Sequence, residues 1–142
     1  MLFSELCKKF QRILFEKILR KNKNEYLVKR VKSFGYAIEG IVGMFRTQVH
    51  AQIHLLAIGI ITVLGFYLKL NAGEWCWIVS CMGIVLSLEA VNTAIENLTD
   101  LASPEYHELA KKAKDTAAGA VLIAVIFCGI VWGIIFLPKL LH

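Results

Sequence analysis

The chain of 142 residues contains little that would break a helix: two prolines, Pro104 and Pro138, and ten glycines. Long helices are therefore possible over most of its length, because these are the two residue types that helix interiors tolerate least. The sequence also lacks the loop G-x-x-x-x-G-K-[ST] and the glycine-rich signature of soluble protein kinases. A nucleotide, if one binds, would therefore have to be held without either of these phosphate-binding loops.

The cysteines lack the spacing of a metal site or redox pair. There are four, with neither a C-x-x-C pair nor a Cys/His ligand pattern. Cys76, Cys81 and Cys128 lie in apolar segments, and we expect the four, Cys7 included, to be small buried side chains. The N-terminus has no apolar core followed by a small-residue cleavage site, so we expect no cleaved signal peptide.

What the chain has in excess is apolar side chains. Hydrophobic residues make up 57% of it and the mean hydropathy is +0.60, whereas soluble domains contain roughly 45–50% apolar residues. In a bilayer the backbone must satisfy its hydrogen bonds internally, and helices do so. Together with the scarcity of helix breakers, this composition predicts an all-α integral membrane protein.

Basic charge is concentrated at one end of the chain. The formal net charge is +5, and eleven of the sixteen Lys and Arg residues precede position 47. No aromatic platform is interleaved with these charges, so we expect no nucleic-acid partner. An anionic lipid surface fits better, because each Lys or Arg near it gains about 1 kcal/mol.

Two segments of this basic region have the periodicity of amphipathic helices. They are residues 1–20 and residues 28–48, and both are expected to lie on the membrane surface. The polar run RKNKNE, from Arg20 to Glu25, interrupts the pattern and predicts a link between two helices. We interpret residues 1–27 as a basic extension and residues 28–142 as the main domain.

Three apolar runs approach the length needed to cross a bilayer. They cover residues 53–68, 75 to about 98, and 116–137, and Pro138 closes the third. A short turn, residues 69–74, joins the first two, and the polar residues 99–115 with Pro104 predict a solvent-facing connection. Basic residues gather before position 47 and in this connection, which places both on the cytoplasmic side.

The second run carries polar side chains that hydrocarbon disfavours: Glu89, Asn92, Glu96 and then Asp100. At about 100° per residue these positions fall within roughly 80° of arc, so they share one helix face. A charged residue within a membrane helix costs about 2.5–3.5 kcal/mol on insertion scales, which makes function the default hypothesis. The stripe therefore predicts a site that faces the interior of a helix bundle.

Depth in the membrane indicates a role for each group. Glu89, the deepest carboxylate, is a candidate general base toward a lipid hydroxyl, and Glu96, nearer the cytosol, is a candidate Mg²⁺ ligand. Asn92 could donate to a phosphate oxygen or orient Glu96. Lys114 offers a positive charge to a polyphosphate at the membrane surface.

The same residues admit other interpretations. The two glutamates could bind a transported cation or form interhelical hydrogen bonds, as in a non-enzymatic, ion-coupled membrane protein. Lys114 alone could be an interfacial lysine. We interpret His54 as a polar group at a helix start rather than a ligand, and His107 as a loop residue.

The stretch EAVNTAIENLTD from Glu89 to Asp100, followed by SPEYHELA and then AKD ending at Asp115, closely resembles the prokaryotic diacylglycerol kinase and undecaprenol kinase family. The similarity extends from about Lys29 to Lys139. The resemblance implies a lipid kinase that uses Mg²⁺ and ATP. It also implies a homotrimer of three-span protomers with an amphipathic surface helix, in the bacterial cytoplasmic membrane, with sites at subunit boundaries on the cytoplasmic side.

By motif position the resemblance makes Glu89 the general base, supported by Asn92, and Glu96 a metal ligand. Contacts to the nucleotide are implied for Gln48, Glu96, Glu105, Tyr106, His107, Lys114 and Asp115, and Lys29 and Tyr36 match positions that approach nucleotide or lipid.

Two positions depart from the pattern. Lys29 stands where diacylglycerol-specific members have Arg, and Gln48 stands where the family has a second metal-binding Glu. Either the Gln48 carbonyl oxygen binds the metal, or Glu39 or Asp115 compensates, or metal affinity is lower.

The variants S-P-E-Y-H and A-K-K-A-K-D are more similar to the undecaprenol kinases of the family than to its diacylglycerol-specific members. We therefore expect phosphorylation of undecaprenol to undecaprenyl phosphate. The alternative is a diacylglycerol kinase that makes phosphatidic acid.

Overall fold

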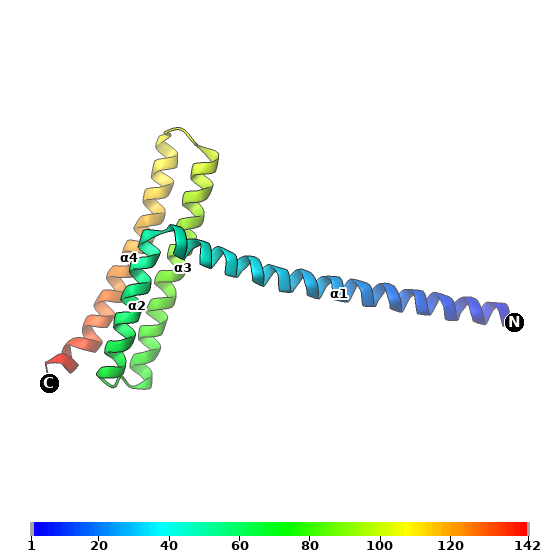
Figure 1. Cartoon of the computed structure of the whole chain (residues 1–142), viewed down its shortest axis with the longest axis horizontal. Helices are drawn as coiled ribbons and strands as arrows, with labels where there is room; N and C mark the ends of the chain where they lie inside the picture. The colour runs from blue at the N-terminus through cyan, green and yellow to red at the C-terminus, as the bar shows by residue number, and fades with distance from the viewer. Residues whose placement is uncertain (1, 142) are drawn as a thin grey trace. The chain divides into compact units, whose positions relative to one another are not determined.

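The computed structural model describes the backbone of residues 2–141 and the side chains of residues 25–141. Four helices account for most of the described backbone: α1 (Leu2–Thr47), α2 (Val49–Tyr67), α3 (Ala72–Ala102) and α4 (Glu108–Leu140) (Figure 1). No strand occurs within residues 2–141, which confirms the all-α class. The chain forms two compact units, with the boundary between Val42 and Gly43.

α1 is one continuous helix through Arg20 and Glu25, so the predicted link between two helices is wrong. Arg, Lys and Glu are strong helix formers, and the run contains neither Gly nor Pro. The polar run RKNKNE therefore interrupts the apolar periodicity of the sequence but not the helix itself. The amphipathic face expected for residues 1–20 and the burial of Cys7 lie outside the side chains that the structure describes.

Gln48 is the single non-helical residue between α1 and α2. Its backbone is extended, with φ −99° and ψ 114°, and its side chain does not cap α2. Gln52 stabilises the junction instead, because its Nε2 donates to the carbonyl oxygen of Phe45 at 3.0 Å. α2 therefore begins at Val49, earlier than the predicted start of the first span at Ile53.

A tight turn joins α2 to α3. Asn71 and Glu74 form a capping box, in which the Glu74 amide donates to Asn71 Oδ1 at 3.0 Å and the Asn71 amide donates to Glu74 Oε2 at 2.7 Å. Gly65 lets the Trp75 ring approach the α2 backbone, since a Cβ there would lie 2.9 Å from the ring. The turn is shorter than predicted, because Glu74 already lies in the first turn of α3.

The polar connection predicted for residues 99–115 is mostly helical, and only residues 103–107 lie outside helices. Figure 1 shows α3 and α4 side by side up to this connection, beyond the start of α2. Polar contacts stabilise the beginning of α4: the amide of Leu109 donates to His107 Nδ1 at 3.2 Å, and Lys112 pairs with Glu108 at 2.8 Å. A segment too polar for hydrocarbon can therefore still continue a helix outside it.

The two prolines have different environments. Pro104 lies in the connection after α3, as predicted. Pro138, predicted to close the third span, lies inside α4, which continues to Leu140. In the last turn a proline removes one helical hydrogen bond, and here the helix extends past it.

α3 is the centre of the bundle formed by the described residues, because its backbone comes close to the backbones of both α2 and α4, whereas the backbones of α2 and α4 lie farther from each other. Small side chains, here Cys81, Ala124 and Cys128, let helices approach closely in a bilayer.

The predicted burial of Cys81 and Cys128 is confirmed, but Cys76 is exposed. The two apolar clusters are Cys81, Val85, Ala124 and Cys128, and Leu70, Ile78 and Phe136.

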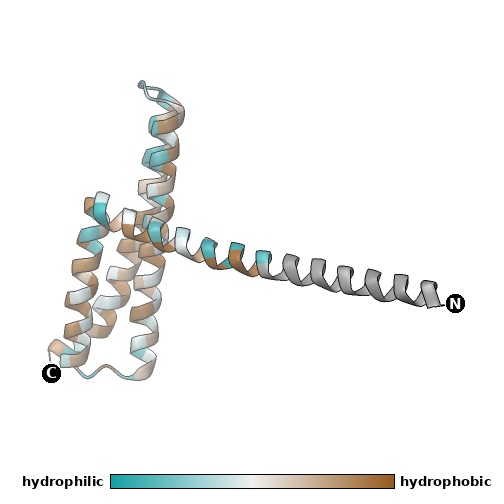
Figure 2. Ribbon diagram, turned by 45° about the vertical axis from the view of Figure 1, so that its right-hand side comes forward, coloured by the Kyte–Doolittle hydropathy of each residue, from teal (hydrophilic) through white to brown (hydrophobic). Residues whose placement is uncertain are grey.

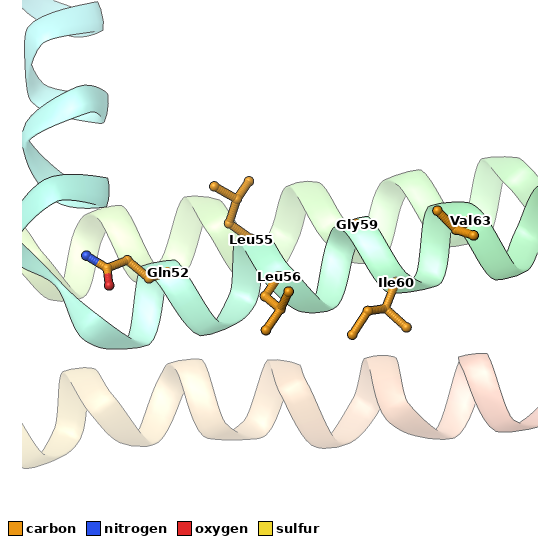
Figure 3. A pocket seen from close by; sticks show the side chains of 6 residues that line it. All are labelled: Gln52, Leu55, Leu56, Gly59, Ile60 and Val63. Carbon is orange, nitrogen blue, oxygen red and sulfur yellow. The ribbon is translucent and has the colours of Figure 1, made fainter.

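Three helices, α2, α3 and α4, are long and apolar enough to cross a membrane, which confirms the three predicted spans. Figure 2 shows apolar residues along these helices and hydrophilic residues around the α3–α4 connection. α2 also bears an open apolar groove of about 700 Å³ (Figure 3), in which Leu56 and Ile60 project from the same side of the helix. Exposed apolar surface of this extent is typical of contact with lipid or another helix.

Candidate active site

Glu89 is buried inside the bundle rather than exposed on its surface. Its exposed fraction is 2%, and the fractions of Asn92 and Thr93 are 6% and 8%. The three- and four-residue spacing of Glu89, Asn92 and Glu96 brings them onto one face of α3. A carboxylate in a membrane helix is costly, and orientation toward the interior is what a functional group requires.

Glu89, Asn92 and Glu96 line one cavity of about 280 Å³. We call it the carboxylate cavity. α2 contributes His50 and His54 to its wall. α4 contributes four further residues: Ala118, Val121, Leu122 and Val125. The polar stripe of α3 therefore faces a cavity whose walls come from three helices.

Asn92 lies between the two carboxylates of this face in the sequence and hydrogen-bonds to one of them, Glu96. Its Nδ2 donates to Glu96 Oε1 at 3.1 Å, which holds the Glu96 carboxylate in a defined position. Its Oδ1 is buried and has no hydrogen-bond partner. An unpaired buried acceptor is unfavourable, so Asn92 retains the capacity to bind a donor or a cation.

Thr93 carries a second unpaired polar atom in the same region. Its Oγ1 is buried without a partner, whereas the hydroxyls of Thr62 and Thr99 donate to the carbonyl oxygens four residues earlier, at 2.7 and 2.6 Å. The Thr93 hydroxyl is therefore available one helical turn after Glu89.

The oxygen atoms on this face suit a hard divalent cation, which prefers carboxylate and amide oxygens. The candidates are the Glu96 carboxylate and the unpaired Oδ1 of Asn92. Within the described residues no cluster of three or more His, Cys, Asp or Glu side chains forms a complete metal site. An Mg²⁺ ion here would take its remaining ligands from water and phosphate, as this ion commonly does.

A second pocket of about 330 Å³ lies at the α3–α4 connection. We call it the connection pocket. It brings together five residues to which the resemblance gives nucleotide contacts, and they come from both sides of the connection: Glu105, Tyr106, His107, Lys114 and Asp115. Asp100, the last member of the polar stripe, also lines it. The stripe on α3 therefore runs from the carboxylate cavity to this pocket.

Lys114 of α4 forms an ion pair with Asp100, the last residue of the polar stripe on α3. Its Nζ contacts Asp100 Oδ1 at 2.9 Å, across the two helices, and its side chain is 37% exposed. Lys111 lines the same pocket. A polyphosphate in this pocket would compete with Asp100 for Lys114, since both are anionic oxygen ligands for an ammonium group.

The other predicted contacts lie elsewhere in the chain. Lys29 and Tyr36 belong to the unit that ends at Val42; Lys29 pairs with Glu25 at 3.4 Å, and Tyr36 is exposed. Gln48 is half-buried between α1 and α2 and does not line the carboxylate cavity.

Three polar residues of this region were missed from the sequence: His50, His54 and Thr93. His54, interpreted as a helix-start group, lines the carboxylate cavity from α2. No local signal places His54 there, because apart from His50 the other lining residues come from α3 and α4. Thr93 could have been found, since it directly follows Asn92 inside the stretch EAVNTAIENLTD that carries the family resemblance.

The sequence model of the prokaryotic diacylglycerol kinase family matches residues 35–136. The undecaprenol kinase of Bacillus subtilis (strain 168) is 43% identical over 109 residues, covering 77% of this chain and 89% of that protein. The diacylglycerol kinase of Synechocystis sp. is 42% identical over 129 residues, covering 89% and 73%. The diacylglycerol kinase of Escherichia coli (strain K12) is 31% identical over 105 residues, covering 74% and 86%.

These matches exclude the non-enzymatic alternative, because the family and its relatives are named as lipid kinases. A kinase of this kind uses ATP and a lipid acceptor, and the three apolar helices place it in a membrane. With the buried Glu89 of α3 and a pocket that holds Lys114 at the α3–α4 connection, the chain belongs to the prokaryotic diacylglycerol kinase family of membrane lipid kinases.

Proposed function

We propose that this lipid kinase phosphorylates undecaprenol to undecaprenyl phosphate at the carboxylate cavity. The observation that carries the proposal is the buried Glu89, which lies in a cavity with one polar wall and one apolar wall. A lipid alcohol has the same division, with a hydroxyl at one end and hydrocarbon behind it. The cavity therefore suits the acceptor, and the connection pocket suits the nucleotide.

Glu89 acts as the general base. Its carboxylate accepts the proton of the lipid hydroxyl while the hydroxyl oxygen forms a bond to the γ-phosphorus of ATP. The bond from that phosphorus to the bridging oxygen breaks, and ADP leaves with the electron pair. The products are the lipid phosphate, ADP and one proton, which Glu89 returns to water. Phosphoryl transfer needs mainly positioning and charge stabilisation, so one base and nearby cations suffice.

Glu96 and Asn92 would hold Mg²⁺, which when bound neutralises charge on the phosphate oxygens. The support for this assignment is the hydrogen bond that fixes Glu96 and the unpaired Oδ1 of Asn92. Gln48 would contribute at most a neutral carbonyl oxygen, which is a weaker ligand than a carboxylate. We expect a higher Mg²⁺ requirement than a glutamate at this position would give.

The connection pocket would bind the polyphosphate. Lys114 supplies its charge after exchanging Asp100 for a phosphate oxygen. The remaining nucleotide contacts are assigned to Glu105, Tyr106, His107 and Asp115 in the same pocket, and to Lys29 and Tyr36 of α1.

Undecaprenol is preferred as the acceptor on two grounds. The S-P-E-Y-H and A-K-K-A-K-D variants favour it, and the undecaprenol kinase of Bacillus subtilis is similar over 89% of its length. Diacylglycerol is the second candidate, because the diacylglycerol kinase of Synechocystis sp. is 42% identical.

We further propose a homotrimer in the bacterial cytoplasmic membrane, with the basic N-terminal part and both pockets on the cytoplasmic side. The excess of Lys and Arg before position 47 supports this orientation. The apolar groove on α2 supports a contact with lipid or a second protomer. Residues 1–27 would be an added surface anchor, in keeping with a family match that begins at residue 35.

A side-by-side assay tests the proposed substrate. Purified protein in mixed micelles is given Mg·ATP with undecaprenol, with diacylglycerol, or with neither. We expect lipid-dependent ADP release with a higher kcat/KM for undecaprenol. A higher value for diacylglycerol would reassign the acceptor, and Glu89→Gln should abolish turnover with both while the protein still assembles.

A further inference from the structure

His54 lies where two cavities meet. The carboxylate cavity, of about 280 Å³, and a deeper cavity of about 90 Å³ share two lining residues, His54 of α2 and Val125 of α4. The deeper one is lined besides by Ala57, Ile58, Met82, Val85, Cys128 and Trp132, and we call it the apolar cavity. The two cavities therefore adjoin at the residues they share, with His54 between the polar cavity and the apolar one.

The chemistry changes sharply across this boundary. On one side are Glu89, Asn92 and Glu96. On the other side, the wall consists of aliphatic, sulfur-containing and aromatic side chains. A ligand that fills both cavities must therefore have a polar end and an apolar body, with the change of character next to His54.

The imidazole of His54 has hydrogen-bonding capacity to spare. The residue is half-buried in a membrane helix, and none of the hydrogen bonds made by side chains of residues 25–141 involves it. An imidazole has two ring nitrogens, each of which can take part in a hydrogen bond. A ligand atom at the boundary would supply the missing partner.

We propose that His54 binds the hydroxyl-bearing end of the lipid alcohol and so sets its position against Glu89. The proposal rests on the lipid kinase function proposed above. A ring N–H of His54 donates to the alcohol oxygen, while the alcohol O–H donates to the Glu89 carboxylate. The oxygen has two lone pairs, so one stays available for attack on phosphorus. The first carbons of the chain occupy the apolar cavity.

This arrangement favours one chemical class of acceptor. A cavity of about 90 Å³ behind His54 has room for the start of one hydrocarbon chain. A primary alcohol on a single chain fits it, whereas two chains on a glycerol backbone would diverge at the boundary. His54 is thereby a determinant of acceptor binding rather than of nucleotide binding.

Three variants test the role of His54. His54→Leu fills similar space without a hydrogen bond, and His54→Gln keeps an N–H donor. Thr62→Val is the matched control, because it removes a polar group of α2 whose hydroxyl is satisfied within the helix, by Ile58 O at 2.7 Å. Each protein is assayed in micelles with undecaprenol varied at saturating Mg·ATP, and then with Mg·ATP varied.

We expect His54→Leu to raise KM for the lipid alcohol about tenfold, the effect of one lost hydrogen bond, with KM for Mg·ATP unchanged. His54→Gln should stay within about threefold of the original protein, and Thr62→Val should match it. An unchanged lipid KM in His54→Leu, or equal impairment in His54→Gln, would overturn the assignment. The proposed function fails separately, if the unaltered protein turns over no lipid alcohol.

Discussion

Replacement of Asn92 should reduce activity much more than it reduces the stability of the fold. Replacing it with alanine removes the hydrogen bond from its Nδ2 to Glu96 Oε1, 3.1 Å long. Hydrogen bonds to a charged group contribute about 1.5–3 kcal/mol. If that energy holds Glu96 in place for the metal, kcat/KM for Mg·ATP should fall about 10- to 150-fold.

Stability should change far less. The substitution also removes the buried Oδ1 that has no partner, and an unpaired buried acceptor costs about 1–3 kcal/mol. The lost hydrogen bond and the relieved acceptor oppose each other. We therefore expect the free energy of unfolding to stay within about 1 kcal/mol of the original value.

The assay measures turnover against Mg²⁺ concentration and unfolding by denaturing detergent in the same micelles. Asn97→Ala is the matched control, because Asn97 is an exposed asparagine of the same helix. Asn92→Ala should need more Mg²⁺ for half-maximal rate, and Asn97→Ala should not. An unaltered Mg²⁺ titration in Asn92→Ala would refute the role given to the hydrogen bond, as would a loss of activity that only follows a loss of folded protein.

Further predictions concern the connection pocket, the packing and the metal. Lys114→Gln should raise KM for ATP about tenfold, whereas Asp100→Asn, which removes only an exposed partner, should leave the thermal unfolding midpoint unchanged and KM for ATP no higher. Ile78→Ala, at a residue with 0% exposure, should lower the free energy of unfolding by about 2–5 kcal/mol; Val79→Ala, at 59% exposure, should change it by about 0.5 kcal/mol or less in the same detergent titration. Gln48→Glu should lower the Mg²⁺ concentration for half-maximal rate, and an identical titration would show that this position is not a ligand.

The membrane-spanning helices could be predicted from the composition of the sequence, whereas the residues at which the helices begin and end could not. Hydropathy located three spans because hydrocarbon admits long apolar runs, and α2, α3 and α4 contain them. The ends were misplaced because polarity marks the membrane boundary, whereas the backbone marks the helix. Residues 108–115 are polar yet helical, supported by the pair of Lys112 with Glu108.

The candidate site could likewise be predicted only in part. Periodicity alone placed Glu89, Asn92 and Glu96 on one face, and these three line one cavity. Periodicity could not identify the neighbours from other helices. Nothing near His54 in the sequence indicates Glu89, because only the packing of α2 on α3 brings the two residues to one cavity. The roles given to single residues came from motif resemblance, which compares positions rather than contacts.

The position of the carboxylate cavity among three helices long enough to cross a membrane has a kinetic consequence. A water-insoluble acceptor that enters this cavity from the side, between the helices, need never leave the bilayer to reach it. Its effective concentration is then its mole fraction in the surrounding lipid or detergent. Adding inert detergent at constant acceptor should slow turnover by surface dilution, while enlarging the aqueous volume should not.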